Sequence, residues 1–284
     1  MSSLREQIGI IRRQLESVYP GDEAEELAWW IAEEQSGLTR TQILTGCKDT
    51  TFFSNTQDII ERLLHFEPIQ YIFGHVLWCG LDLKVTPATL IPRPETAELA
   101  GRVSAFPFPY TSSPVRVLDI GTGSGCIALA LKKAHPEWQV TGIDLSPEAV
   151  EVARTNAERN KADVSFHVAD IFSDAPLPGS GVPYDIIVSN PPYICEKERN
   201  GMRRNVLDYE PSSALFVPDE DPLLFYRRIA SLFRHQAGVF LFFEINEAYP
   251  DELAVMLQNL GYTDIQTTRD IYGKPRIIEA RSAL

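Results

Sequence analysis

From residue 115 onward the chain alternates between predicted strands and helices, and this alternation restricts the fold more than any other feature of the sequence. Short apolar runs rich in β-branched residues predict buried parallel strands, and the longer segments between them predict crossover helices. This order is typical of an α/β fold with a doubly wound sheet. The seven predicted strands cover residues 115–120, 139–143, 164–168, 185–188, 239–245, 263–268 and 276–280, with a hairpin between the last two.

The N-terminal part of the chain has a different pattern. Leu4, Ile8, Ile11 and Leu15 recur at helical spacing, and further apolar stripes of the same kind follow up to about residue 65. No constellation of catalytic side chains occurs there. We therefore predict an N-terminal helical domain over residues 1–67 that docks a substrate and carries no chemistry itself.

A second change of pattern follows at residue 68. Residues 71–74 and 81–85 are predicted to form two paired strands around a turn at Cys79-Gly80, so that 68–95 is a β-hairpin linker. Residues 96–284 then form the α/β domain.

Composition excludes several classes of function. Of the 284 residues 44% are hydrophobic and 23% are charged, which is typical of a soluble globular protein. The net charge of −13 argues against nucleic acid as the main substrate, because a protein that grips a nucleic-acid backbone normally has a basic face. No apolar stretch is long enough to span a membrane, and the first residues lack the apolar core of a signal peptide, so we expect a cytoplasmic protein without a membrane partner.

The four cysteines and five histidines are scattered, without a CxxC pair. This spacing argues against a zinc site and a disulfide framework, so no metal is expected. We expect a monomer.

The turn Gly121-Thr122-Gly123-Ser124-Gly125 follows the first predicted strand of the α/β domain. Glycines let the backbone turn sharply and approach a ligand closely, although a glycine-rich turn alone is also found in dinucleotide-binding proteins. Asp144 ends the second strand, where a carboxylate can accept hydrogen bonds from ribose hydroxyls. The alternative for Asp144 is a turn residue before the helix that Ser146 and Pro147 begin.

Two further segments complete the candidate ligand site. Asp170 follows the third strand and can accept a hydrogen bond from an exocyclic amine, while Ile171 or Phe172 can flank an aromatic base. Residues 90–96 contain two prolines that stiffen the chain. They form either a wall of the substrate site or a rigid linker with a helix cap.

The fourth strand ends in Ser189-Asn190-Pro191-Pro192-Tyr193, where the prolines stop the strand. Asn190 offers a side-chain carbonyl oxygen, and Pro191 offers a main-chain carbonyl whose direction is restricted by the fixed φ. Two such acceptors suit a planar NH2 group. Tyr193 supplies a flat ring that can stack on a substrate. The alternative is an ordinary turn that merely ends the strand.

Taken together, the glycine turn, Asp144, Asp170 and residues 190–193 resemble the class I S-adenosylmethionine-dependent methyltransferases that modify amino-group nitrogens. Further segments narrow the resemblance to the release factor glutamine methyltransferases and extend it over nearly the whole chain. These segments are PIQYIFG (68–74), LIPRPET (90–96), VSNPPYI (188–194), EPSSAL (210–215) and DIYGKPR (270–276).

This resemblance implies methylation of the side-chain amide nitrogen (N5) of the glutamine in the Gly-Gly-Gln motif of class I peptide chain release factors. S-adenosyl-L-methionine would be the methyl donor and S-adenosyl-L-homocysteine the product. Residues 121–125 would hold the methionine part of the cofactor, Asp144 the ribose, and Asp170 with Ile171 the adenine. Asn190 would also contact the cofactor. Residues 190–193 would hold the glutamine, with Asn190, Pro191 and Tyr193 as the catalytic residues.

The sequence departs from the family pattern in two places. Ala97 stands where glutamate is expected after Glu95-Thr96, beside the predicted substrate wall. Asn246-Glu247 stands where Gly-Gln is expected after Glu244-Ile245. Because this strand end is distant in sequence from the site, we expect the second departure to be structural.

Three rival functions remain open at this point. An adenine-N6 DNA methyltransferase would present the same NH2 group to the same loop, but it needs base flipping and a cationic DNA groove. A nicotinamide-dependent dehydrogenase or a cofactor-binding module without activity would share the glycine turn. Neither of these two would explain Asn-Pro-Pro-Tyr.

Overall fold

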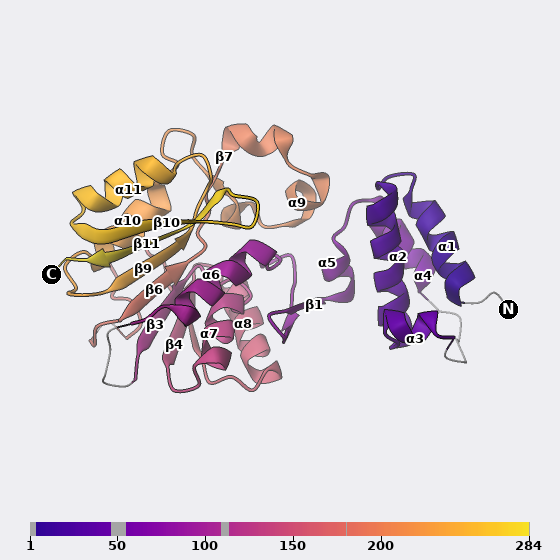
Figure 1. The fold of residues 1–284 in the computed structure, drawn as a ribbon, viewed down its shortest axis with the longest axis horizontal. Helices are drawn as coiled ribbons and strands as arrows, with labels where there is room; N and C mark the ends of the chain where they lie inside the picture. Colours follow the sequence, from indigo (N-terminus) through magenta and orange to yellow (C-terminus); the bar gives the residue numbers. More distant parts are fainter. Residues whose placement is uncertain (1–3, 47–54, 109–113, 180, 284) are drawn as a thin grey trace. The chain divides into compact units, whose positions relative to one another are not determined.

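The computed structural model describes residues 4–46, 55–108, 114–179 and 181–283, which divide into two compact units (Figure 1). The first unit comprises the chain up to Phe73 together with Arg204–Tyr209. The second comprises Gly74–Arg203 and the chain from Glu210 onward.

The first unit is helical, as predicted. Its apolar residues at helical spacing pack into one core that includes Ile8, Leu15, Ile31 and Leu63. Thr39 caps the third helix, because its side chain accepts from the backbone N–H of Gln42 in a capping box. The helices are α1 (Leu4–Leu15), α2 (Gly21–Ser36), α3 (Arg40–Leu44), α4 (Thr56–Leu64), α5 (Ile69–Phe73) and α9 (Arg204–Tyr209).

The predicted hairpin is present, but its first strand was placed wrongly. Residues 69–73 form α5, in which the carbonyl of Pro68 accepts from the N–H groups of Tyr71 (2.9 Å) and Ile72 (3.1 Å). Gly74, at φ 75°, ends this turn of helix. The strands are β1 (His75–Trp78) and β2 (Leu81–Lys84), which pair antiparallel around the predicted turn at Cys79-Gly80.

The second unit contains a seven-stranded sheet in the order β10-β11-β9-β6-β3-β4-β5. Strands β9, β6, β3, β4 and β5 are parallel to one another, and β11 joins them antiparallel through β9 and pairs with β10 as a hairpin. All seven predicted strands are present, which confirms the predicted α/β fold. The strands are β3 (Arg116–Ile120), β4 (Gln139–Asp144), β5 (Ser165–Val168), β6 (Ile186–Ser189), β9 (Phe240–Glu244), β10 (Tyr262–Arg269) and β11 (Pro275–Ser282).

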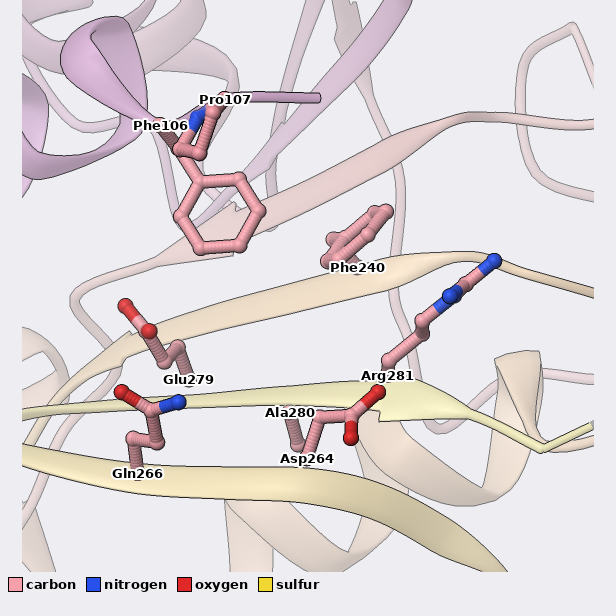
Figure 2. Close-up of a pocket in the computed structure, with 8 residues that line it drawn as sticks. All are labelled: Phe106, Pro107, Phe240, Asp264, Gln266, Glu279, Ala280 and Arg281. Carbon is pink, nitrogen blue, oxygen red and sulfur yellow. The ribbon is translucent and has the colours of Figure 1, made fainter. Parts of the chain in front are cut away.

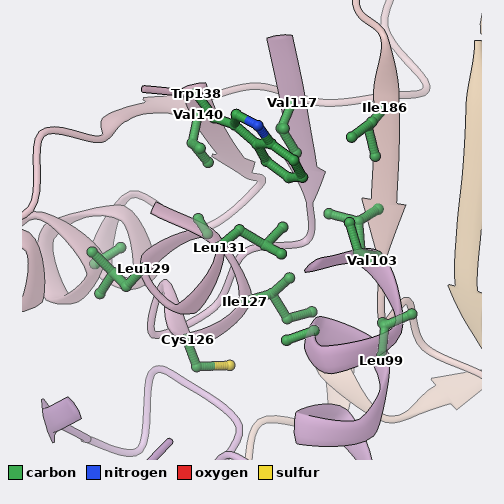
Figure 3. Packing of buried hydrophobic residues seen from close by; sticks show 14 of the residues in the cluster. Leu99, Val103, Val117, Cys126, Ile127, Leu129, Leu131, Trp138, Val140 and Ile186 are labelled. Atoms are coloured by element: carbon green, nitrogen blue, oxygen red, sulfur yellow. The ribbon is translucent and has the colours of Figure 1, made fainter. Parts of the chain in front are cut away.

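Helices cover both faces of this sheet, because alternate side chains of a strand point to opposite faces. Val117 of β3 packs with helices α6 (Pro94–Ala105), α7 (Cys126–Ala134) and α8 (Pro147–Arg159), and Figure 3 shows side chains of α6 and α7 against the strands. Leu118, the next residue, faces the other layer. That layer contains α10 (Leu224–Phe233) and α11 (Pro250–Asn259).

The chain between β6 and α10 leaves the main sheet. It forms a small two-stranded sheet and returns to α10 after the segment that joins the helical unit. Its elements are β7 (Ile194–Cys195), the 3-10 turns η1 (Glu196–Gly201) and η2 (Ser212–Ala214), α9, and β8 (Phe216–Val217). None of the helices in the described parts of the chain is long and apolar enough to cross a membrane.

Candidate active site

The predicted ligand-binding segments meet at the carboxyl edge of the sheet. Ile120, the last residue of β3, lies opposite Ile143 of β4 on one side and Ser189 of β6 on the other. The next residues along these three strands are Gly121, Asp144 and Asn190. The hydroxyl of Ser189 donates to the carbonyl of Ile120 at 2.6 Å and fixes the two strand ends beside each other.

A cavity of about 420 Å³ opens at this edge. Most of the predicted site residues line it. Gly125 and Tyr193, which were also predicted, lie outside the lining. The predicted residues that line the cavity are Gly121, Thr122, Gly123, Ser124, Asp144, Asp170, Ile171, Asn190, Pro191 and Pro192.

The three glycines of the turn have different surroundings. Gly121 and Gly123 have φ values of 70° and 54°, and a Cβ added to either would meet no atom within 4 Å. The backbone therefore faces open space there and can approach a ligand closely. A Cβ on Gly125 would come within 3.0 Å of Phe166 and 3.2 Å of Ala153. Gly125 is therefore required for close packing against Phe166 and Ala153, whereas the space at Gly121 and Gly123 is open.

Asp119 fixes the glycine turn through two hydrogen bonds. Its Oδ2 atom accepts from the Thr122 hydroxyl at 2.6 Å and from the backbone N–H of Ala128 at 3.2 Å. The side chain is fully buried in the sheet, and burial raises the pKa of Asp119 to about 7.

Asp144 connects the second strand to the glycine turn. One carboxylate oxygen accepts from the N–H of Gly123 at 2.8 Å, and the other accepts from the N–H of Ser146 at 3.0 Å. Burial raises the pKa of Asp144. Each carboxylate oxygen can accept more than one hydrogen bond, so Asp144 keeps capacity for a ligand hydroxyl.

An apolar corner lies beside Asp170. The Asp170 carboxylate accepts from the N–H of Phe172 at 2.8 Å, which fixes the loop after β5. Ile171 and Phe172 line the cavity together with Phe225 of α10, whose ring stands edge-on to that of Phe172 at 5.5 Å. A flat aromatic ligand fits between such side chains.

Asn190 is held by groups far away in the sequence. Its Nδ2 atom donates to the Thr96 hydroxyl at 3.1 Å, and that hydroxyl donates to the carboxylate of Glu244 at 2.7 Å. The hydroxyl of Tyr193 donates to the other oxygen of Glu244 at 3.2 Å. Burial raises the pKa of Tyr193, so this hydroxyl keeps its proton. Tyr193 thus supports the loop from behind.

The stretch 90–93 forms a wall of the cavity, where Leu90, Pro92 and Arg93 are part of the lining. A buried carboxylate fixes it, because Glu210 accepts from the Arg93 guanidinium at 2.5 Å and from the N–H of Ile91 at 3.1 Å. This ion pair supports the interpretation of 90–96 as a site wall over that of a plain linker.

The two departures from the family pattern have local explanations. Ala97, on α6, packs against the apolar cluster beneath that helix. Asn246 donates to the carbonyl of Tyr193 at 3.0 Å and to the Glu198 carboxylate at 3.1 Å. The end of β9 is therefore distant from the site only in sequence, because Glu244 and Asn246 both contact the loop that carries Asn190.

Sequence reasoning missed two residues of this site. Glu244 belongs to the family pattern, but the sequence does not indicate a role for it in the site, because an acid at the end of an apolar strand is common and its partners are far away in the chain. Phe225 lies on a helix whose apolar stripe has no feature that separates site residues from core residues. The sequence predicts Thr96 only as part of a wall and does not indicate its hydroxyl contact with Asn190.

A second hollow of about 330 Å³ lies against β9, β10 and β11 (Figure 2). Its main acid, Glu279, is already paired with Arg102 through two hydrogen bonds of 2.7 Å. Arg281 lies over the ring of Phe240. None of the predicted site residues lines this hollow, so the candidate site is the larger cavity.

Comparison with known proteins shows which family the chain resembles. Residues 106–207 match the family described as Methyltransferase small domain, and residues 10–74 match the PrmC N-terminal domain. A protein of Bacteroides thetaiotaomicron called release factor glutamine methyltransferase is 45% identical over 276 residues, which are 95% of this chain and 97% of that protein.

The chain belongs to the release factor glutamine methyltransferase family. A second member, from Flavobacterium psychrophilum, is 36% identical over 93% of this chain and 94% of that protein. A solved methyltransferase structure from Pyrococcus furiosus covers 82% of this chain and all of its own, with a TM-score of 0.50 and 22% identity, and this likeness shows the fold. Membership of this family excludes a dehydrogenase as the function.

Proposed function

We propose that this protein methylates the side-chain amide nitrogen (N5) of the glutamine in the Gly-Gly-Gln motif of class I peptide chain release factors, with S-adenosyl-L-methionine as methyl donor. The observation that carries the proposal is that Asn190 and Pro191 line the same cavity as Gly121, Gly123 and Asp144. The loop proposed for the substrate and the turn proposed for the cofactor therefore share one space, in a chain of this family.

The polar groups and the apolar side chains that line the cavity fit the cofactor. The open backbone at Gly121 and Gly123 suits the methionine part, and Asp144 suits the ribose hydroxyls. Asp170 and the apolar corner at Ile171 suit the adenine. When bound, S-adenosylmethionine supplies an electrophilic methyl group on a sulfonium.

The loop at Asn190 orients the amide nitrogen of the substrate for attack on the methyl group. An amide nitrogen is a poor nucleophile, because its lone pair is delocalised into the carbonyl group. Asn190 Oδ1 and the carbonyl of Pro191 accept the two amide hydrogens and direct the nitrogen lone pair into the cavity. Fixed orientation of this kind lowers a barrier by roughly 7–11 kcal/mol in favourable cases.

The same two acceptors also favour the transition state over the ground state. As the amide nitrogen loses planarity its hydrogens become more acidic, so the bonds to Asn190 and Pro191 strengthen. No side chain is assigned as a general base, and the methylated nitrogen loses its proton to water. Tyr193 and Pro192 keep the loop in place.

We further propose that residues 1–67 dock the release factor and that 68–95 connect this docking domain to the methyltransferase domain, residues 96–284. Helix α9 supports such a role, because it belongs to the helical unit although it follows the Asn190 loop in sequence. Within that unit the hydroxyl of Tyr209 donates to the carbonyl of His65 at 2.9 Å, and Arg204 lies over the ring of Phe66. The chain then returns to the cavity wall at Glu210.

The strongest competitor is methylation of an adenine amine in DNA, since that NH2 group would satisfy the same two acceptors. The net charge of −13 opposes binding of a polyanion. A protein substrate is the better match.

The test is to incubate the purified protein with methyl-labelled S-adenosylmethionine and a class I release factor. A release factor with Gln→Ala in the Gly-Gly-Gln motif is the matched control, and duplex DNA is a second acceptor. We expect label on the wild-type release factor alone. Equal labelling of the Gln→Ala protein, or labelling of DNA, would reject the proposed acceptor.

A further inference from the structure

We propose that a buried hydrogen-bond relay, from Glu244 through Thr96, determines which end of the Asn190 carboxamide faces the substrate. The inference rests on the proposed function and adds two positioning residues to it. Thr96 and Glu244 act through Asn190 and are not assigned any contact with the reacting atoms.

The relay connects three parts of the second unit. Glu244 is the last residue of β9 and is 1% exposed, and Thr96 lies in the first turn of α6 and is 3% exposed. The Thr96 hydroxyl donates to Glu244 Oε2 at 2.7 Å, and Asn190 Nδ2 donates to the Thr96 hydroxyl oxygen at 3.1 Å. The hydrogen bonds therefore run in one direction, from Asn190 to Glu244.

Direction matters because an asparagine side chain has nearly the same shape after its oxygen and nitrogen are exchanged. A hydroxyl group has a single proton. Thr96 commits that proton to Glu244, so it can offer only a lone pair to its other neighbour. The NH2 end of Asn190 satisfies this lone pair, whereas the oxygen end would set two acceptors against each other.

The oxygen of Asn190 is thereby left for the cavity. Within the part of the chain that the structure describes, Asn190 Oδ1 takes no hydrogen bond, and Asn190 is one of the residues that line the cavity. An acceptor at this position is what a substrate NH2 group requires. With the opposite orientation, the NH2 group of Asn190 would face the NH2 group of the substrate, and two hydrogen-bond donors would oppose each other.

Glu244 is kept as an acceptor by its surroundings. Tyr193 donates to Oε1 while Thr96 donates to Oε2, and the positive charge of Arg276 lies near enough to stabilise the carboxylate. Burial, the strongest influence, raises the pKa of Glu244 above its ordinary value together with the nearby Glu95, and these three groups limit that rise. Glu244 thus anchors the loop twice, through Asn190 and through Tyr193.

The relay is tested with the matched pair Thr96→Val and Thr96→Ser. Valine has the shape of threonine without the hydroxyl, and serine keeps the hydroxyl. We expect Thr96→Val to lower kcat on the release factor about tenfold to a hundredfold. The Kd of S-adenosylmethionine should stay within about threefold, because the glycine turn and Asp144 are unchanged. Thr96→Ser should recover most of kcat. Equal losses in both variants, or wild-type kcat in Thr96→Val, would overturn the proposal.

A second measurement needs neither turnover nor a variant. In the wild-type protein with a ¹⁵N-labelled carboxamide at Asn190, the relay predicts that one NH2 proton, the one donated to Thr96, exchanges slowly with solvent. Exchange at the rate of a free carboxamide would overturn the relay. If the wild type protects this proton but fails to methylate the release factor, the proposed function is wrong and the relay stands.

Discussion

The two halves of the cavity are built in different ways. The glycine turn is fixed by neighbours close in sequence: Asp119 binds Thr122, three residues away, and Asp144 binds Gly123, 21 residues away. The Asn190 loop is fixed by Thr96, 94 residues away, and Thr96 in turn by Glu244, at a separation of 148 residues. The glycine turn proposed for the cofactor is therefore a local structure, and the half proposed for the substrate depends on the assembled fold.

This difference implies that the two halves can be damaged separately. A change on the glycine side should weaken cofactor binding or the fold around β3. A change on the Asn190 side should remove turnover and leave cofactor binding intact. Mutations at the two sides test whether the division is real.

The largest effect is expected for Asn190→Ala. Without the side-chain acceptor one amide hydrogen of the substrate has no partner, and kcat should fall by about a thousandfold or more. The Kd of S-adenosylmethionine, measured by calorimetry, should change by less than about threefold. If a loss of cofactor binding accounted for the whole loss of turnover, Asn190 would act on cofactor binding, and the two halves of the cavity would not have separate roles.

The next effect concerns stability and its dependence on pH. Because burial raises the pKa of Asp119 to about 7, the folded protein binds this proton more tightly than the unfolded chain, whose pKa is near 3.8. The stabilisation from Asp119 is complete below about pH 4 and is lost as the pH rises towards 7, with a slope of up to about 1.4 kcal/mol per pH unit.

Asp119→Asn should remove this slope, since the amide cannot ionise. Relative to the wild type, the free energy of unfolding of the variant should therefore increase between pH 4 and 7, as measured by urea titration at each pH. Parallel pH profiles for the two proteins would show that Asp119 does not titrate in this range.

The smallest effect is expected for Asp144→Ala. Loss of a charged acceptor for ligand hydroxyls should weaken S-adenosylmethionine about tenfold to a hundredfold. Turnover with saturating cofactor should be nearly normal, because Asn190 and Pro191 are untouched. A fall in kcat without a change in cofactor Kd would show that Asp144 acts on turnover and not on cofactor binding, which would contradict the proposed division.

The same division explains what could be predicted from the sequence. The seven strands and the glycine turn follow from local patterns, namely apolar runs and glycines at strand ends. The strand register then brings Gly121, Asp144 and Asn190 to one edge, as parallel strands must. Hydrogen bonds across 94 and 148 residues leave no local pattern, so the roles of Thr96 and Glu244 emerge only from the fold.

The one wrongly placed strand has a similar cause. Tyr71-Ile72-Phe73 consists of residues that favour strands, yet it forms a turn of helix. Pro68 begins this turn, and Ile69 and Ile72 pack into the core of the helical unit. Packing therefore overrides local preference here, and no local pattern reveals that packing.

The central claim is that two fixed oxygens at the end of β6 hold both hydrogens of a glutamine carboxamide. The most direct test is a crystal structure of the protein with S-adenosylhomocysteine and a release factor. The claim predicts that the glutamine nitrogen lies within hydrogen-bond distance, about 3.2 Å or less, of both Asn190 Oδ1 and the Pro191 carbonyl oxygen. A glutamine bound with its carbonyl oxygen toward Asn190, or bound outside this cavity, would contradict it.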